Sequence, residues 1–209
     1  MLRLNKLEER AILGVVFIKM NSEKKKNSFI FGTEDFILYI LNHLEPDKSD
    51  KIRLNKIAFL IEFAYISLKE RYLSRAKYAA IDNGAVIDSY KSILDKMEKK
   101  DKIKIDGYFV RPLQSQKISV PEEVSSFLNP LIEKYSALNN RELINLSHST
   151  DSYKITTDND RRMGGIIDKK LALLETFFVG DEVAEVGLNE EKLPVINRKK
   201  LVEYEFKAI

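Results

Sequence analysis

The chain has 209 residues, 44% of them hydrophobic, which is enough apolar material for a packed core. Its 35 basic and 32 acidic residues nearly cancel, which argues against the strongly basic surface of a duplex-binding protein. It contains no cysteine, so disulfides, thiolate zinc sites and cysteine nucleophiles are excluded together. The apolar run at residues 11–18 is too short to span a bilayer. These properties predict a cytoplasmic protein without membrane contact.

The first third of the chain is predicted to be mainly helical. Residues 1–31 form an N-terminal extension, whose apolar runs at 11–20 and 29–31 suit a hairpin, or a helix in the first of them. Thr33, followed by two acidic residues, predicts a capped helix start, and this helix should end near His43. A longer helix over about 52–70 is expected to be the central core helix, because its apolar residues recur at three- and four-residue spacing.

The middle of the chain carries turn signals and alternating residues. Residues 76–81 are short and apolar, Asn83-Gly84 marks a turn with positive φ, and Asp88 is expected to cap a helix that reaches about residue 100. Over residues 102–110, isoleucines alternate with polar residues and an Asp-Gly pair follows, which predicts a small β-hairpin.

The last part is predicted to return to helices and to end in a strand. Pro121 with two following glutamates predicts a helix to about residue 137, and further helices are expected over 140–146 and 166–178. Alternation over 202–208 predicts a terminal strand. The fold class is therefore mainly α (α+β), a helical bundle-like domain with a small antiparallel hairpin or sheet. We expect this domain to cover residues 32–180, with extensions at 1–31 and 181–209.

The sequence offers little material for catalysis. Its two histidines, His43 and His148, are far apart and lack a second ligand at metal spacing, so we expect no metal site. Gly164-Gly165 follows two arginines but lacks the further glycines and lysine of a phosphate loop. We therefore expect no enzyme, no catalytic residue and no cofactor. Three lysines at 24–26 and the arginines at 161–162 keep one alternative open, a nucleic-acid-binding regulatory protein of phage or mobile-element origin.

Three short segments carry a resemblance to a known family. They are a helix start, a turn that leads into a helix, and a segment that contains a histidine and is followed by an aromatic residue. In that order, their positions are Leu54, Asn55 and Lys56; Asn83, Gly84, Val86 and Tyr90; and Leu146, His148 and Tyr153. In this order and spacing they resemble the Panacea domain, which is found in phage-associated proteins and as the shared antitoxin of many toxin–antitoxin pairs. The family's turn has a proline where this chain has Ala85, and its last aromatic is a tryptophan where this chain has Tyr153.

The resemblance implies a mostly helical domain that neutralises a cognate toxin by direct contact. It also implies a possible second partner, an ATP-dependent protease to which the toxin is delivered. The shared motifs have a structural interpretation as well, in which they define the fold and leave the partner surface elsewhere. Aromatic residues outside the motifs are candidates for that surface, because they dominate interface energetics; they are Tyr108 and Phe109 in the predicted hairpin, and Tyr204 and Phe206 in the predicted terminal strand.

Overall fold

The computed structural model describes residues 29–113 and 118–178, all within one compact unit that ends at Phe178. Helices and short antiparallel strands make up this part of the chain, which confirms the predicted mainly α fold with a small antiparallel sheet. Two predictions lie outside the described residues: the structure of the first apolar run, and the terminal strand with Tyr204 and Phe206. No helix in the described part is long and apolar enough to cross a membrane.

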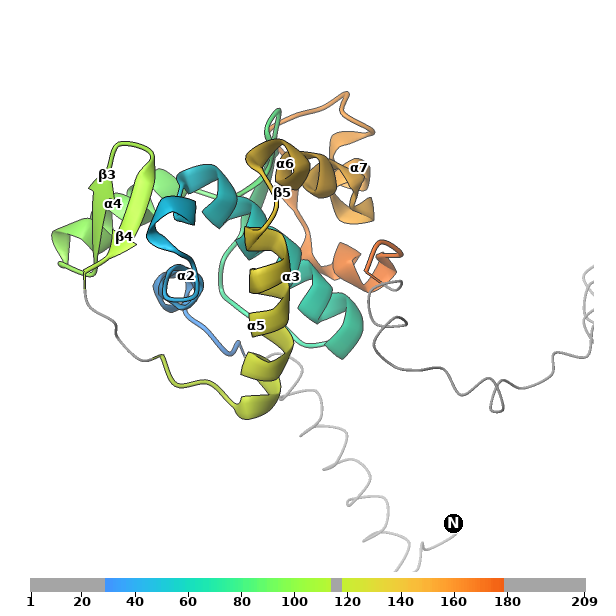
Figure 1. Cartoon of the computed structure of the whole chain (residues 1–209). Coiled ribbons are helices and arrows are strands. Elements are labelled where there is room, and N and C mark those ends of the chain that lie inside the picture. Colours follow the sequence, from blue (N-terminus) through green and yellow to red (C-terminus); the bar gives the residue numbers. More distant parts are fainter. Residues whose placement is uncertain (1–28, 114–117, 179–209) are drawn as a thin grey trace, which may run out of the picture. The chain divides into compact units, whose positions relative to one another are not determined.

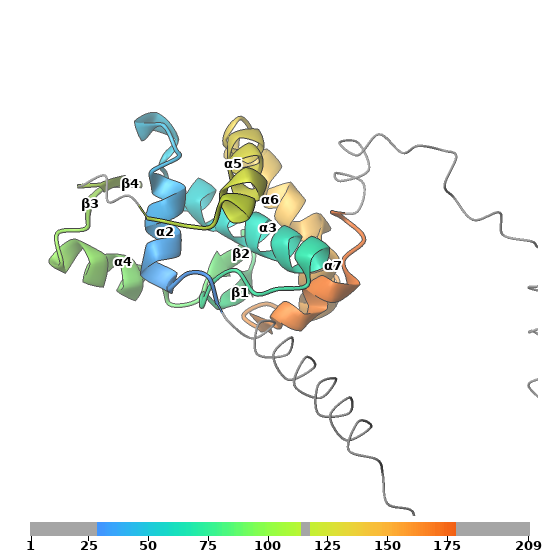
Figure 2. The same ribbon diagram turned by 90° about the horizontal axis from the view of Figure 1, so that it is seen from below.

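Helix α3 (Lys51–Lys69) is the central element, as predicted, and packs against α2, α5, α6 and strand β2 (Figures 1 and 2). It starts at Asp50, whose carboxylate accepts hydrogen bonds from the amides of Ile52 and Arg53. The structure buries every residue from Leu54 to Ile66, so the helix is covered on all sides. The predicted apolar stripe is correct but too narrow, because a helix at the centre of a domain has no face left for water.

Helix α2 (Thr33–Leu41) precedes α3, and the short 3₁₀ helix η1 (Pro46–Lys48) lies between them. The helix was predicted correctly, but the expected cap is wrong. Gly32 occupies the N-cap position without a side-chain hydrogen bond, and Thr33 is already the first helical residue. Two acidic side chains in the first turn, Glu34 and Asp35, still favour this end through the helix dipole.

Strands β1 (Tyr78–Ile81), β2 (Gly84–Ile87) and β5 (Ile166–Ile167) form an antiparallel sheet in the order β2-β1-β5. The turn at Gly84 has φ +80°, as predicted, and joins β1 to β2 in a hairpin that was not anticipated. One face of the sheet is buried against the core; its residues are Tyr78, Ala80, Ala85, Ile87 and Ile167. The hydroxyl of Tyr78 donates to the carbonyl of Ala58, which ties this face to α3.

Helix α4 (Tyr90–Lys99) and the hairpin of β3 (Ile103–Asp106) and β4 (Phe109–Pro112) follow. The hairpin is confirmed, with Ile105 opposite Val110. The cap predicted for α4 is wrong: Ser89 is the N-cap residue, with φ 58° and no side-chain hydrogen bond. Asp88 instead donates its backbone amide to the carbonyl of Lys77 and so closes the β1–β2 hairpin.

The remaining helices are α5 (Glu122–Ser136), α6 (Asn140–Ser149), α7 (Asp151–Thr157) and the 3₁₀ helix η2 (Lys169–Leu174). Helix α5 was predicted, α6 is longer than predicted, and α7 falls between the helices predicted over 140–146 and 166–178, where no helix was predicted. The helix expected over 166–178 is wrong, because β5 and η2 occupy that stretch. The carboxylate of Asp168 caps η2 at Lys170, and Ile166 pairs with Ala79 in the sheet, which ends any continuous helix there.

Candidate functional site

The family-motif segments meet at the free edge of strand β2. This strand lies at the end of the sheet, so its outward backbone groups have no neighbouring strand. Helices α3 and α6 both pack against it (Figure 2). Because buried backbone groups must find hydrogen-bond partners, this edge has to be completed by side chains from those helices.

Three side chains complete the edge. Ser147 Oγ accepts a hydrogen bond of 2.8 Å from the amide of Ala85, and Lys56 Nζ donates one of 2.7 Å to the carbonyl of the same residue. Asn55 Oδ1 accepts a bond of 2.8 Å from the amide of Ile87, while its Nδ2 donates to the carbonyl of Lys51. The helix-start motif and the histidine segment therefore act together in place of a fourth strand.

Gly84 is required at the start of this edge for two reasons. Its φ of +80° is a conformation that residues with a side chain rarely adopt. A Cβ built at this position would also lie 2.9 Å from Ser147 Oγ and 3.2 Å from Lys56 Cε. The glycine thus allows both side chains to approach the backbone of the hairpin.

Lys56 is the most electrostatically unusual residue of this cluster. Its side chain is 1% exposed and has the Ala85 carbonyl as its hydrogen-bond acceptor, with no carboxylate paired to it in the described part of the chain. Burial disfavours the charged ammonium and lowers the pKa of Lys56 to about 7. The amine can donate the same hydrogen bond when neutral, so the contact does not require the charge.

His148 and Tyr153, the last two motif positions, form a second cluster beside the first. Their rings lie 4.5 Å apart, and His148 Nδ1 is 3.1 Å from a carboxylate oxygen of Asp160. The hydroxyl of Tyr153 donates to the carbonyl of Ile81 at the end of β1. Burial is the main reason that the pKa of Tyr153 rises to about 12, so this hydroxyl stays protonated as a donor. The pair fixes the loop after α7 to the sheet.

The other motif positions do not join either cluster. Leu54 is part of the core, Asn83 is exposed in the turn, and Tyr90 and Leu146 pack partly buried against the core. Val86 lies half-buried on the outward side of β2. Ser147 was missed as a site residue although it stands inside the histidine segment, since a serine in a helix usually has only a local role.

A buried ion pair further along α3 was also missed. Glu62 is fully buried and accepts hydrogen bonds from the amide and hydroxyl of Ser74 and from Lys169 Nζ, the last at 2.8 Å. Burial raises the pKa of Glu62 and lowers that of Lys169, although each charge partly offsets the effect on the other. Lys169 thereby holds η2 against α3. An acidic residue between Ile61 and Phe63, in a helix apolar on all sides, was the available signal.

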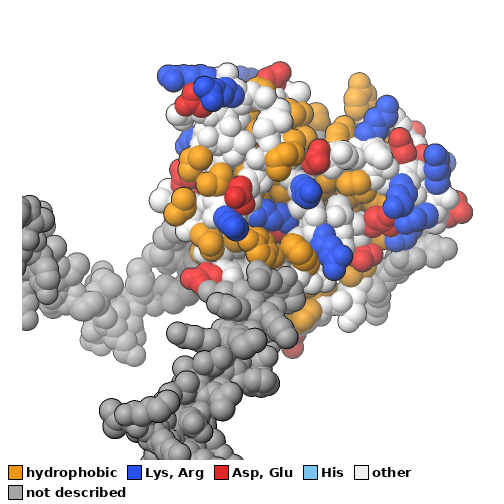
Figure 3. Space-filling view, turned by 180° about the vertical axis from the view of Figure 1, so that it is seen from behind, with side chains coloured by type: hydrophobic (Ala, Val, Ile, Leu, Met, Phe, Trp, Pro, Cys, Tyr) orange, Lys and Arg blue, Asp and Glu red, His pale blue; other side chains and the backbone are white. Residues whose placement is uncertain are grey.

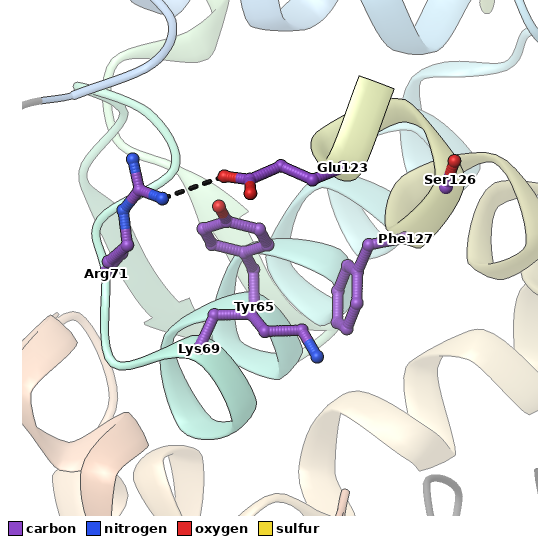
Figure 4. Close-up of a pocket in the computed structure, with 6 residues that line it drawn as sticks. All are labelled: Tyr65, Lys69, Arg71, Glu123, Ser126 and Phe127. Atoms are coloured by element: carbon purple, nitrogen blue, oxygen red, sulfur yellow. Dashed lines mark hydrogen bonds and ion pairs between the residues drawn. The ribbon is translucent and has the colours of Figure 1, made fainter. Parts of the chain in front are cut away.

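A surface pocket of about 520 Å³ lies between the end of α3 and the start of α5 (Figure 4). Two aromatic rings, Tyr65 and Phe127, and the ion pair of Arg71 with Glu123 at 2.9 Å line it together with Lys69 and Ser126. Arg71 and Glu123 pair with each other across the pocket, and Lys69 lies over the ring of Phe127. No group of three histidine, cysteine or acidic residues in the described ranges could hold a metal ion.

Of the candidates for partner contact, Tyr108 and Phe109 lie in the described residues, next to each other in the β3–β4 hairpin. Tyr108 is 81% exposed at the turn, whereas Phe109 is partly buried and bridges to Asp50. Figure 3 shows hydrophobic side chains in several groups between charged ones on one face of the molecule. Exposure alone therefore does not single out a partner surface.

The comparison with protein families agrees with the motif clusters. Residues 54–154 match the model of the family described as antitoxin SocA-like, Panacea domain. Searches of curated proteins and of solved structures gave no match. The matched range begins at the helix-start motif in α3 and ends just after Tyr153 in α7, so it contains all three motif segments and the β2 edge that they complete. Residues 54–154 of this chain are accordingly similar to the Panacea domain of the antitoxin SocA-like family.

Proposed function

We propose that this protein is an antitoxin that binds a toxin protein directly and masks it. The observation that carries the proposal is the family match over residues 54–154, whose name describes an antitoxin domain. The geometry of the motifs supports a binding role, because Asn55, Lys56 and Ser147 direct their polar atoms at the protein's own backbone. Residues engaged in this way stabilise the fold and leave the exposed surfaces to the partner.

A non-catalytic role is the one that the family suggests, and the environment of His148 supports it. Nδ1 is engaged by Asp160, and Nε2 is buried without a hydrogen-bond partner in the described part of the chain. A general base must reach the proton that it removes from a substrate. We therefore expect His148→Ala to change stability or partner binding and to abolish no turnover.

The proposal includes two finer features. The domain is expected to act in the cytoplasm, with residues 32–180 as the toxin-binding body and the segments before and after as extensions. Delivery of the bound toxin to an ATP-dependent protease is the second mode of action, beside simple masking. Tyr108 and Phe109, with Tyr204 and Phe206, remain candidate contacts for either mode.

Co-expression tests the proposal. The full chain carrying an affinity tag is purified from its native cells, the bound proteins are identified by mass spectrometry, and each is expressed alone and together with the full chain. We expect one of them to arrest growth alone and to be neutralised by co-expression. Growth arrest that the chain does not relieve, for every bound protein, would contradict the proposal. A toxin level that falls only in cells with the intact protease would favour delivery over masking.

A further inference from the structure

We propose that the outer face of the β2-β1-β5 sheet, with the loop at residues 158–165, is the surface on which the toxin docks. This inference rests on the antitoxin function proposed above. The outer face consists of the outward-pointing residues of the three strands, which are Ala79 and Ile81 on β1, Val86 on β2 and Ile166 on β5.

The composition of this face is unusual for a sheet exposed to water. Ala79 lies opposite both Val86 and Ile166, so these three side chains share one side of the sheet. Ile81 is 37% exposed and Ile166 is 54% exposed, and the residues paired opposite them in the sheet, Gly84 and Ala79, are apolar. An antiparallel sheet normally alternates buried apolar residues with polar ones that face water. Here both sides are apolar, which is typical of a surface that a partner covers.

The loop beside this face has an unusual backbone conformation. Asp158, Asn159 and Asp160 follow each other with φ of 50°, 54° and 66°, in the left-handed region that Asp and Asn adopt more readily than other residues with a side chain. Such conformations persist only where surrounding contacts impose them, and they concentrate at sites of function.

Contacts on three sides impose that conformation. His148 engages the carboxylate of Asp160, and the carbonyl of Thr157 accepts the amides of both Arg161 and Arg162. On the sheet side, the amide of Gly164 donates to the carbonyl of Ala80. The motif residues His148 and Tyr153 thus help to present a fixed loop next to the outer face. A surface held rigid before binding loses less entropy when the partner arrives.

The charge of the loop indicates the chemistry of the partner. Arg161 is 3.9 Å from the carboxylate of Asp158, and Asp160 is engaged by His148. Arg162 is exposed and forms no ion pair with a described residue. Met163, which is 38% exposed, continues the apolar face toward this arginine. The surface therefore fits an apolar patch of a protein that has a carboxylate at its margin, and the toxin is that protein.

Binding measurements with the toxin identified above test this surface. The variants are Ile166→Asp in the face and Arg162→Glu in the loop, each checked by circular dichroism and thermal unfolding. Leu174→Asp is the matched control, since this leucine is 64% exposed on η2 and receives the same change. We expect at least a tenfold loss of affinity for Ile166→Asp, at least fivefold for Arg162→Glu, and less than twofold for Leu174→Asp.

A second measurement uses the unaltered chain, so that it does not depend on any variant folding. With ¹³C-labelled isoleucine methyl groups, addition of the toxin should shift or broaden the signals of Ile81 and Ile166. The signal of Ile52, which is 40% exposed on α3, should stay in place.

Several results would overturn the inference while the antitoxin function stands. One is toxin binding by Ile166→Asp and Arg162→Glu within twofold of the wild type. Another is loss of binding only in a Tyr108→Ala, Phe109→Ala double variant, which would place the interface on the hairpin. A third is binding of a 30-base-pair DNA duplex that Arg162→Glu abolishes while toxin binding is unchanged. If the wild-type chain neutralises no protein at all, the proposed function fails and this inference fails with it.

Discussion

The buried amine of Lys56 gives the domain a defined dependence of stability on pH. Its pKa falls from 10.5 to about 7 because the side chain is almost fully buried and has no carboxylate beside it among the described residues. Between these two values the unfolded chain binds a proton that the folded chain does not. The free energy of unfolding therefore rises with pH across this window. Below about pH 7 both states are charged, and the cost of burying the ammonium is fully present.

The magnitude follows from the same two pKa values. A difference of one pKa unit corresponds to about 1.4 kcal/mol, so the complete change across the window is on the order of 4–5 kcal/mol. From pH 7 to pH 9, Lys56 should contribute a gain of about 2 kcal/mol in the free energy of unfolding. Lys169, whose pKa is also lowered by burial, adds to the total with the same sign.

Urea unfolding at pH 7, 8 and 9 measures this contribution in the wild type and in Lys56→Met. Methionine keeps the length of the side chain and removes the titrating group, while the contribution of Lys169 stays the same in both proteins. We expect the gain between pH 7 and 9 to be smaller in Lys56→Met by about 2 kcal/mol. Lys104→Met, at an exposed lysine of β3, is the control and should keep the wild-type slope. Equal slopes in wild type and Lys56→Met would refute the burial argument.

Three further substitutions test the packing. Ile61→Ala should lower the free energy of unfolding in urea by about 2–5 kcal/mol, because the side chain is 0% exposed. Ile52→Ala, in an exposed position of the same helix, should lower it by less than about 1 kcal/mol. Equal losses would mean that the burial is misassigned. Gly84→Ala should lower the free energy of unfolding by about 1–3 kcal/mol, and by more than Gly107→Ala does. Both glycines have positive φ, but nothing lies within 4 Å of a Cβ at 107. A larger loss for Gly107→Ala would disprove the close contact at Gly84. Lys169→Met should lower the free energy of unfolding by about 3–5 kcal/mol, because it leaves the buried carboxylate of Glu62 unpaired. An unchanged thermal unfolding temperature would show that the pair of Lys169 and Glu62 does not hold η2.

Local patterns in the sequence determined most of the helices. Each of these signals acts on residues close to it in the sequence, so it can be recognised without the tertiary structure. The signals are the apolar spacing in α3, the Asp-Gly turn of the β3–β4 hairpin and the proline before α5. Helix caps were less predictable: Thr33 and Asp88 have the right chemistry, but Gly32 and Ser89 occupy the cap positions. The choice between neighbouring residues depends on how the preceding segment is anchored, which the local sequence does not contain.

The function of the motif residues could not be read from their spacing. The sequence placed Asn55 and Lys56 at a helix start and Gly84 in a turn, and the resemblance grouped them into a family. Only the tertiary structure shows that Asn55, Lys56 and Ser147 bond the free edge of β2, because those bonds join residues up to 62 positions apart.

What the sequence by itself determined is the class of fold, its central helix and its resemblance to a family, since each depends on short stretches of residues. The short strand β5 and the outer face of its sheet were decided by the tertiary structure alone. Ile166 and Ile167 form a strand only because β1 offers an unpaired edge to them. A strand of two residues is too short for a conformational preference to show in the sequence. Its structure comes from backbone hydrogen bonds to β1, which is distant in the sequence.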